Sequence, residues 1–306
     1  MTTHRFVATQ WHNVLGTLPP ALSIASGDIV ITETLDAGGV DKDGIARSHG
    51  PNPMNGPIFV EGAEPGDALK VEILRMTPIR ANGWTRTSLA GNVVDPEFVR
   101  TLPPRDKVTW AIDRQGLTVA LDPPVPGLEY LVLPLEPMIG CFGVAPALGQ
   151  AFSTATSAEN GGNMDYRGFR PGTTVWFPVA VAGALFFVGD CHATQGDGEI
   201  VGTGIETAFE VELRLTVDKA KRLTWPRGET ETDIFSVGNA RPLDQALQHA
   251  TTDMFVWLTT EYGLSPAAAS HLMGQVVCYD VGNVFDPAYT MVCRIAKKWL
   301  AGSRAS

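Results

Sequence analysis

Glycine and proline interrupt this 306-residue chain so often that few stretches can form long helices. The sequence holds 32 glycines and 22 prolines, and only 18% of its residues are charged. Hydrophobic residues make up 44%, which is enough for a sizeable core. Short apolar runs between glycine- and proline-rich turns are typical of strands, and a long extended strand is expected over residues 202–215. The pattern predicts an α+β fold that is mainly β, with a β-sandwich core.

Helical spacing of apolar residues occurs only near the C-terminus. It runs from residue 242 to residue 262, with Pro242 suited to the first turn and Gly263 to the stop. A second, shorter helix is expected over residues 265–273, with a serine as its cap. We therefore predict a C-terminal helical pair packed against the sandwich, and a single domain over residues 1–306.

The stretch from residue 189 to residue 199 (Gly-Asp-Cys-His-Ala-Thr-Gln-Gly-Asp-Gly-Glu) follows an apolar run over residues 179–188. A buried strand that ends in a glycine-rich acidic loop is a common support for catalytic groups. If the strand continues through His192, then Asp190 and His192 share one face and offer an oxygen and a nitrogen to a divalent ion such as zinc. The pair can also be a carboxylate that orients a general base, or the loop can be a simple turn.

Three further polar residues are candidates for a catalytic or substrate-binding role. Glu61 follows the strand expected over residues 57–60 and precedes a glycine, so it can point into a cleft as a general acid or base. Asn163 and Asp165 share a loop with two glycines, and an asparagine amide can hydrogen-bond an amide substrate or an oxyanion. Each of these loops can equally be a turn without a chemical role.

Charge and cysteine spacing exclude several classes of function. The formal net charge of −10 provides no electrostatic footprint for nucleic acid or an anionic membrane. The N-terminus lacks a signal-like pattern, and the longest apolar run, residues 178–188, is too short to span a bilayer, so we expect a cytoplasmic protein. The four cysteines form no CxxC pair, and Cys191 should face away from Asp190 and His192, which disfavours a nucleophilic thiol.

Four motifs follow one another along most of the chain. They are residues 52–67 (Asn-Pro-Met-Asn-Gly-Pro-Ile-Phe-Val-Glu-Gly-Ala-Glu-Pro-Gly-Asp), residues 136–140 (Glu-Pro-Met-Ile-Gly) running to 143–146 (Gly-Val-Ala-Pro), residues 161–165 (Gly-Gly-Asn-Met-Asp) and residues 189–199. Their sequences and order resemble the acetamidase/formamidase family, which is distinct from the amidase-signature and nitrilase types. The resemblance implies hydrolysis of a small amide to a carboxylate and ammonia, a sandwich of jelly-roll type, a metal site and a homo-oligomer.

The resemblance also implies a third metal ligand. Residues 33–36 (Glu-Thr-Leu-Asp) resemble an early segment of the family, and Asp36 is the expected partner of Asp190 and His192. A divalent ion held there, zinc by expectation, would polarise an amide carbonyl or activate a water.

We expect the other candidate residues to act next to that ion. Glu61 or Glu199 would take a proton from the water and pass it to the leaving amine. Asn163 and Asp165 would orient the amide of the substrate.

Two other functions remain open from the sequence. An enzyme on the same frame can open cyclic amides or cleave larger ones, because the long loop over residues 40–56 and the segment over residues 75–107 can shape a wider pocket. A non-enzymatic binding sandwich is the other alternative, although the seven tryptophans are scattered along the chain rather than clustered.

Overall fold

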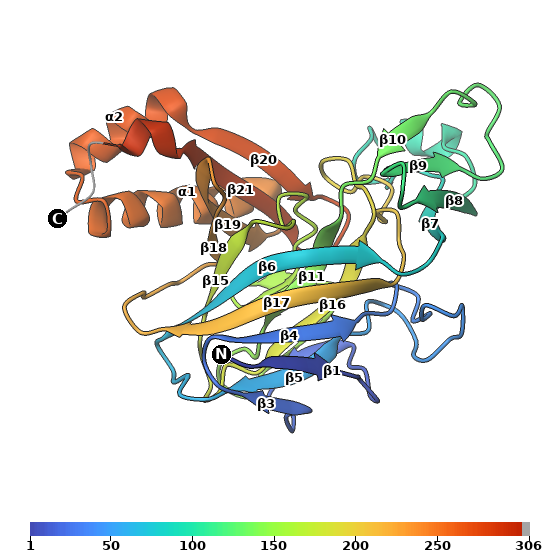
Figure 1. Ribbon diagram of the computed structural model, residues 1–306. Coiled ribbons are helices and arrows are strands. Elements are labelled where there is room, and N and C mark those ends of the chain that lie inside the picture. The colour runs from blue at the N-terminus through green and yellow to red at the C-terminus, as the bar shows by residue number, and fades with distance from the viewer. Residues whose placement is uncertain (302–306) are drawn as a thin grey trace.

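Two β-sheets pack face to face and form the body of the protein (Figure 1). The computed structural model describes residues 1–301. The larger sheet has nine strands in the order β1 (Thr3–Phe6), β4 (Asp28–Glu33), β17 (Phe209–Asp218), β6 (Ala68–Pro78), β15 (Thr174–Pro178), β18 (Arg227–Glu229), β19 (Asp233–Ala240), β21 (Tyr289–Ala296) and β20 (Cys278–Asn283). The smaller sheet has six, in the order β13 (Ser157–Ala158), β14 (Gly161–Asn163), β11 (Met138–Val144), β16 (Phe186–His192), β5 (Asn55–Val60) and β3 (Leu22–Ile24).

Neighbouring strands within the described part of the chain run antiparallel, apart from the parallel pairs β1–β4 and β3–β5. A hydrophobic core lies between the sheets and takes buried side chains from both, such as Val211 and Ile73 on one side and Phe142 and Val188 on the other. The prediction of a mainly β sandwich is confirmed. The prediction of one domain over residues 1–306 stays a prediction, and residues 302–306 lie outside the described part.

The alternating sequence of β17 explains its place in the larger sheet. Val211, Leu213 and Leu215 are buried in the core, whereas Glu210 and Glu212 lie on the outer face. There the Arg75 guanidinium pairs with Glu210 at 2.8 Å and with Glu212 at 3.1 Å. The strand is shorter than predicted, because residues 202–208 are irregular and regular pairing begins only at Phe209.

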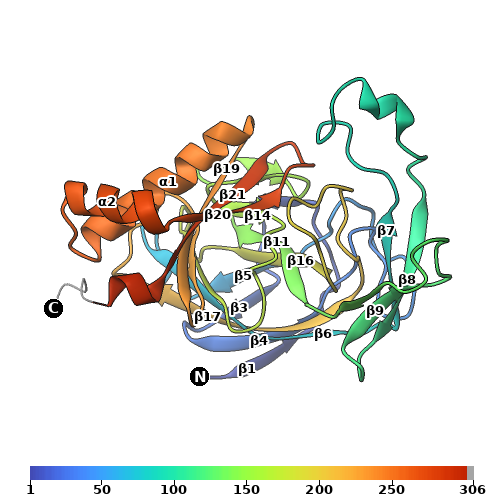
Figure 2. The same cartoon turned by 90° about the horizontal axis from the view of Figure 1, so that it is seen from above.

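A smaller unit projects from one end of the sandwich (Figure 2). It is a four-stranded sheet in the order β10 (Val132–Pro134), β9 (Thr118–Leu121), β8 (Lys107–Asp113) and β7 (Asn82–Arg86). The short helix η1 (Phe98–Thr101) lies in the connection from β7 to β8. Elsewhere in the protein, β12 (Ala151–Ser153) and β2 (Val14–Gly16) form a separate two-stranded sheet.

The two predicted helices are present where the sequence places them. Helix α1 (Leu243–Thr260) directly follows Pro242, and α2 (Pro266–Val276) begins after Ser265, whose hydroxyl accepts a hydrogen bond from the backbone of Ala268. The apolar face of α1 packs on β19 and β21, and a short helix η2 (Lys297–Leu300) ends the described chain. None of the described helices combines the length and the apolarity needed to cross a membrane.

A buried ion pair ties α1 to the larger sheet. Arg227 on β18 is 2% exposed, and its guanidinium donates to both carboxylate oxygens of Asp253 on α1, at 2.7 and 3.1 Å. Burial raises the pKa of Asp253, and the arginine opposes that shift. The arginine therefore stabilises the charged carboxylate of Asp253 in the buried interface between α1 and the sheet.

Replacement of this arginine should loosen the helical pair. Arg227→Met leaves the Asp253 carboxylate buried and unpaired, so we expect the free energy of unfolding to fall by about 3–5 kcal/mol. Chemical denaturation measures the change. The exposed Arg222, which donates only to backbone carbonyls of its own turn, provides the control: Arg222→Met should stay within about 0.5 kcal/mol of the wild type. Equal stability of the two variants would contradict this account.

Candidate active site

The smaller sheet ends in a cavity of about 290 Å³ that is lined mostly by polar side chains. The polar lining residues on the side of the sandwich are Asn52, Asn163, Asp190, Glu199, Glu206 and Asp286. They come from strand ends and loops far apart in the sequence, which converge where β16 and β14 end. All six are buried. A concave site with convergent polar groups is the usual form of an active site.

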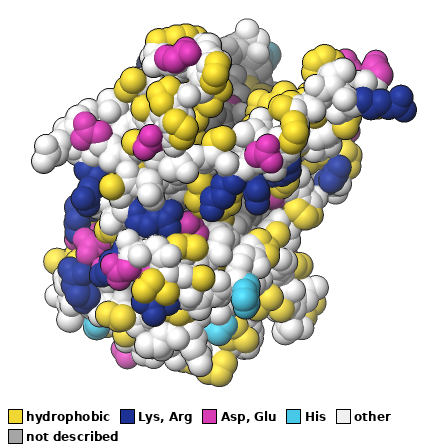
Figure 3. Space-filling view, turned by 90° about the vertical axis from the view of Figure 1, so that its right-hand side faces the viewer, with side chains coloured by type: hydrophobic (Ala, Val, Ile, Leu, Met, Phe, Trp, Pro, Cys, Tyr) yellow, Lys and Arg dark blue, Asp and Glu magenta, His cyan; other side chains and the backbone are white. Residues whose placement is uncertain are grey.

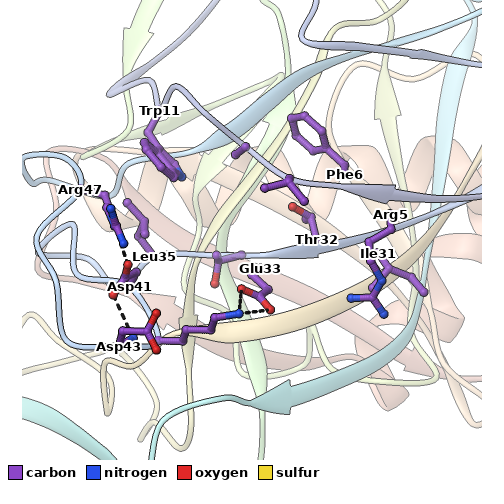
Figure 4. Close-up of a pocket in the computed structure, with 14 residues that line it drawn as sticks. Arg5, Phe6, Trp11, Ile31, Thr32, Glu33, Leu35, Asp41, Asp43 and Arg47 are labelled. Carbon is purple, nitrogen blue, oxygen red and sulfur yellow. Dashed lines mark hydrogen bonds and ion pairs between the residues drawn. The ribbon is translucent and has the colours of Figure 1, made fainter.

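A larger cavity of about 410 Å³ lies elsewhere, between β1, β4 and the loop over residues 41–47 (Figure 4). Four of its charged side chains form two ion pairs: Lys42 lies 2.9 Å from Glu33, and Arg47 lies 2.6 Å from Asp41. A fifth, Arg5, pairs with Glu210 at 2.9 Å. The lining contains no histidine or cysteine, so this cavity lacks the histidine–carboxylate combination found beside the smaller one.

His192 lies next to Asp190 and Glu206, two carboxylates that line the smaller cavity. It is fully buried at the end of β16, and its Nε2 lies 3.0 Å from Oε1 of Glu206 and 3.4 Å from Oδ1 of Asp190. One atom from each of these three residues falls within 4.8 Å of the other two, which is close enough to share a metal ion. The predicted common face of Asp190 and His192 is therefore present.

The other ring nitrogen of His192 is already engaged. Nδ1 lies 2.8 Å from the amide oxygen of Gln195, and the Gln195 amide nitrogen donates to the backbone carbonyl of Asp165 at 2.6 Å. Because an amide oxygen only accepts hydrogen bonds, Nδ1 carries the hydrogen. Nε2 is thus the nitrogen with a lone pair for a ligand.

Asp165 and Glu199 form a second group with His192, again within 4.8 Å. An amide network supports this side of the site. The Asn283 amide donates to Asp165 at 2.7 Å and to Asp286 at 2.6 Å, and Asn163 also donates to Asp286. The carboxylates are thereby held by neutral side chains rather than by cations.

The backbone is bent sharply at the same residues. Positive φ angles occur at Asn52 (45°), Asp165 (45°), Asp190 (51°) and Glu199 (49°). Residues other than glycine rarely adopt this conformation, and such strain concentrates at functional sites. The bends bring polar side chains toward one another from four separate segments.

Burial and like charge shift several pKa values in this group. Burial raises the pKa of Glu206 to about 7, although the histidine opposes the shift. Burial, with Asp165 and Asp286 nearby, raises the pKa of Glu199 well above its usual range. Burial also opposes the charged form of His192, but the Glu206 and Asp190 carboxylates outweigh it and raise the pKa of the ring. The group carries more negative charge than its one histidine can balance.

The unpaired atoms of the group fit a cation. Oδ1 of Asp165, Oδ1 of Asp190, Nε2 of His192 and Oε2 of Glu206 are buried and make no hydrogen bond of good geometry. Buried polar atoms without partners are rare, and four of those in this protein belong to one cluster. Carboxylate oxygens with an imidazole nitrogen are ligands that suit zinc and similar divalent ions.

Two predicted site residues lie apart from this cluster. Glu61 is exposed in the turn after β5 and does not line the cavity. Asp36 is buried, but its Oδ2 accepts from Arg80 at 2.9 Å and from the Trp84 indole at 3.1 Å, while its Oδ1 accepts two backbone N–H groups. Both expectations are therefore corrected, because Glu61 points to solvent and the oxygens of Asp36 already have donors.

Cys191 faces the core, as its position between Asp190 and His192 predicts. Its side chain is fully buried among apolar residues, and burial raises the pKa of the thiol to about 12. A thiol in that state is not a nucleophile.

Glu206 is the functional residue that sequence reasoning misses. It lies in the irregular segment before β17 and makes isolated backbone bridges to His192 and to Trp84. In the sequence it resembles Glu210 and Glu212, which alternate with apolar residues in the next strand. Its bridge to His192 joins separate segments, and no local pattern encodes that pairing.

Comparison with known proteins shows the family to which the chain belongs. The sequence model of the acetamidase/formamidase family matches residues 2–149 and 146–248. The chain belongs to this family. A crystal structure of a predicted acetamidase/formamidase from Thermoanaerobacter tengcongensis superposes with a TM-score of 0.86 at 30% identity, over 99% of this chain and 98% of that one.

Two further relatives give the same result. The crystal structure of an acetamidase from Bacillus halodurans superposes with a TM-score of 0.85 at 30% identity, covering 98% of this chain and 99% of that one. The acetamidase of Mycolicibacterium smegmatis is 30% identical in an alignment of length 246 that covers 62% of this chain. The match covers 59% of that acetamidase, so the chain spans less than two thirds of the length of this curated relative.

Gly140 on β11 should be essential for the close approach of two carboxylates. A Cβ there would lie 2.8 Å from the carbonyl oxygen of Asp190 and 2.9 Å from its Oδ2, and closer still to Oδ1 of Asp165. Gly140→Ala therefore forces a backbone shift, and we expect a loss of about 1–3 kcal/mol in stability. Gly196→Ala is the control, because nothing lies within 4 Å of the added carbon. Thermal unfolding compares the two, and equal midpoints would refute the crowding argument.

Proposed function

We propose that this protein hydrolyses a small amide to a carboxylate and ammonia. The observation that carries the proposal is the buried set of Asp190, His192 and Glu206, whose two carboxylates face one cavity. Membership in the acetamidase/formamidase family supports the same reaction. The acetamidase of Mycolicibacterium smegmatis is named for hydrolysis of such an amide.

We further propose that the site holds one divalent ion, with zinc as the expected metal. Asp190, His192 and Glu206 would be its ligands, because their unpaired atoms converge and Nδ1 of the histidine is occupied by Gln195. When bound, the ion polarises an amide carbonyl or lowers the pKa of a water. The Gln195 amide keeps the ring of His192 in one orientation and one tautomer.

Proton transfer is proposed for Glu199. Its carboxyl group lines the cavity, and its raised pKa favours the protonated form. From that position it can pass the proton to the leaving nitrogen, as a general acid does. Glu61, the other candidate from the sequence, lies on the surface and has no access to the cavity.

Positioning is proposed for Asn163 and Asp165. Both ends of the Asn163 amide are engaged, since its oxygen accepts from Asn52 at 2.8 Å and its nitrogen donates to Asp286. It therefore aims the Asp286 carboxylate at the cavity rather than binding a substrate by itself. Asp165 receives the Asn283 amide and has one free oxygen next to the histidine group.

A cytoplasmic location and a homo-oligomeric state complete the proposal. The first rests on composition and the second on the family resemblance. The net charge of −10 supports a small-molecule substrate rather than nucleic acid as the partner.

Ammonia release from formamide and acetamide tests the proposed reaction. We expect release by the wild type and a loss of at least about 100-fold in kcat/KM for His192→Ala and for Glu206→Gln, because each removes a proposed ligand. Metal content of the same samples should fall with activity. Glu210→Gln is the control, since Glu210 pairs with Arg5 and Arg75 on the outer face and should leave both readouts unchanged. Full activity of a His192→Ala protein would contradict the assignment.

A further inference from the structure

The cavity that holds the carboxylates is also lined by two basic side chains. Arg86, at the end of β7, and Arg105 line the same cavity as Asp190, Glu199 and Glu206. On the face of the molecule that bears the four-stranded sheet, Lys and Arg side chains gather in a band across the middle (Figure 3), although the net charge is −10. The presence of Arg86 and Arg105 in a cavity of this acidic protein suggests that they have a specific role.

Neither arginine forms an ion pair with any carboxylate of residues 1–301. Arg105 donates to the backbone carbonyls of Val201 at 2.7 Å and of Ser88 at 3.3 Å, and its guanidinium lies over the Phe285 ring, 4.8 Å from the centroid. The Arg86 guanidinium lies 5.6 Å from the centroid of the Trp84 ring. Neutral partners and aromatic faces thus position both cations and leave their charges available.

The two guanidinium groups are also close enough to repel each other. Burial lowers the pKa of Arg105 first, Arg86 lowers it further, and Glu199 opposes the shift. Two neighbouring arginines that form no close ion pair are suited to a carboxylate, because the planar guanidinium matches its two oxygens. Formamide and acetamide carry no charge and cannot use such a feature.

The volume of the cavity supports a longer ligand. Its 290 Å³ approaches the range of about 300–1,000 Å³ typical of pockets for drug-sized ligands. Acetamide would fill only part of it. Arg86 and Arg105 line the same cavity as Asp190 and Glu206, so a longer ligand can reach both pairs of side chains.

We propose that the preferred substrate is an amide with a carboxylate at the far end of a short acyl chain, that is, the monoamide of a dicarboxylic acid. Arg86 and Arg105 bind the distal carboxylate, while the amide lies against Asp190, His192 and Glu206. This inference rests on the proposed amide hydrolysis. The opposing explanation is that the arginines only balance the carboxylates of the site, in which case they would affect neutral and anionic amides alike.

Wild-type kinetics test the inference without any substitution. The probes are the monoamides of malonic, succinic and glutaric acid, each compared with the neutral amide of the same carbon number. We expect at least one monoamide to exceed its neutral counterpart about tenfold or more in kcat/KM, as loss of a hydrogen bond to a charged group would predict. If every neutral amide is the better substrate, the inference is overturned while the proposed hydrolysis stands. If no amide is cleaved, the proposed function fails and the inference fails with it.

Variants of the two arginines then distinguish binding of the distal carboxylate from simple balancing of the negative charge of the site. In Arg86→Gln and Arg105→Gln, the ratio of kcat/KM for the anionic amide to that for its neutral counterpart should fall about tenfold or more. Arg86→Lys, which keeps the charge, should recover part of the ratio. Arg222→Gln changes the net charge equally but lies outside the cavity, so its ratio should match the wild type. An unchanged ratio in both arginine variants, with activity lost equally on all amides, would support charge balance and overturn the inference.

Discussion

The mutual repulsion of carboxylates buried around one histidine is the constraint on which the site depends. Asp190 and Glu206 lie within 3.4 Å of Nε2 of His192, and Asp165 and Glu199 form a second group with the same ring. Burial raises the pKa of Glu206 to about 7, and the neighbouring Asp190 carboxylate adds to that shift. A bound divalent cation would relieve that repulsion, and a protein without it would have to hold extra protons instead.

The sandwich supplies the rigidity that such an arrangement needs. The strand β16 is buried along its whole length and delivers His192 to the rim of the core. Gln195 then orients the ring, and Asn283 and Asn163 hold the remaining carboxylates through neutral hydrogen bonds. The positive φ angles at four site residues are tolerated because the surrounding sheets over-determine the backbone. Aromatic rings position the two arginines of the same cavity, so its lining carries charges of both signs.

Local periodicity predicts the parts of the site that one strand or one helix encodes. The two-residue spacing of Asp190 and His192 predicts their common face, and Pro242 and Ser265 correctly predict where the helices begin. Glu61 shows the limit of that reasoning, because a glutamate after a strand can equally face solvent. Glu206 shows it more clearly, since its bridge to His192 depends on long-range pairing of an irregular segment. Asp36 is buried as a ligand would be, and only the positions of Arg80 and Trp84 reveal that its oxygens are occupied.

The central claim is that the cluster around His192 works with a bound divalent ion. The most direct test measures ammonia release from acetamide by the wild-type protein before and after treatment with a chelator, with metal content read on the same samples. The account predicts that metal removal abolishes release and that added zinc restores it. Undiminished release from protein shown to be free of metal would contradict the claim and would leave Asp190, His192 and Glu206 as acid–base groups.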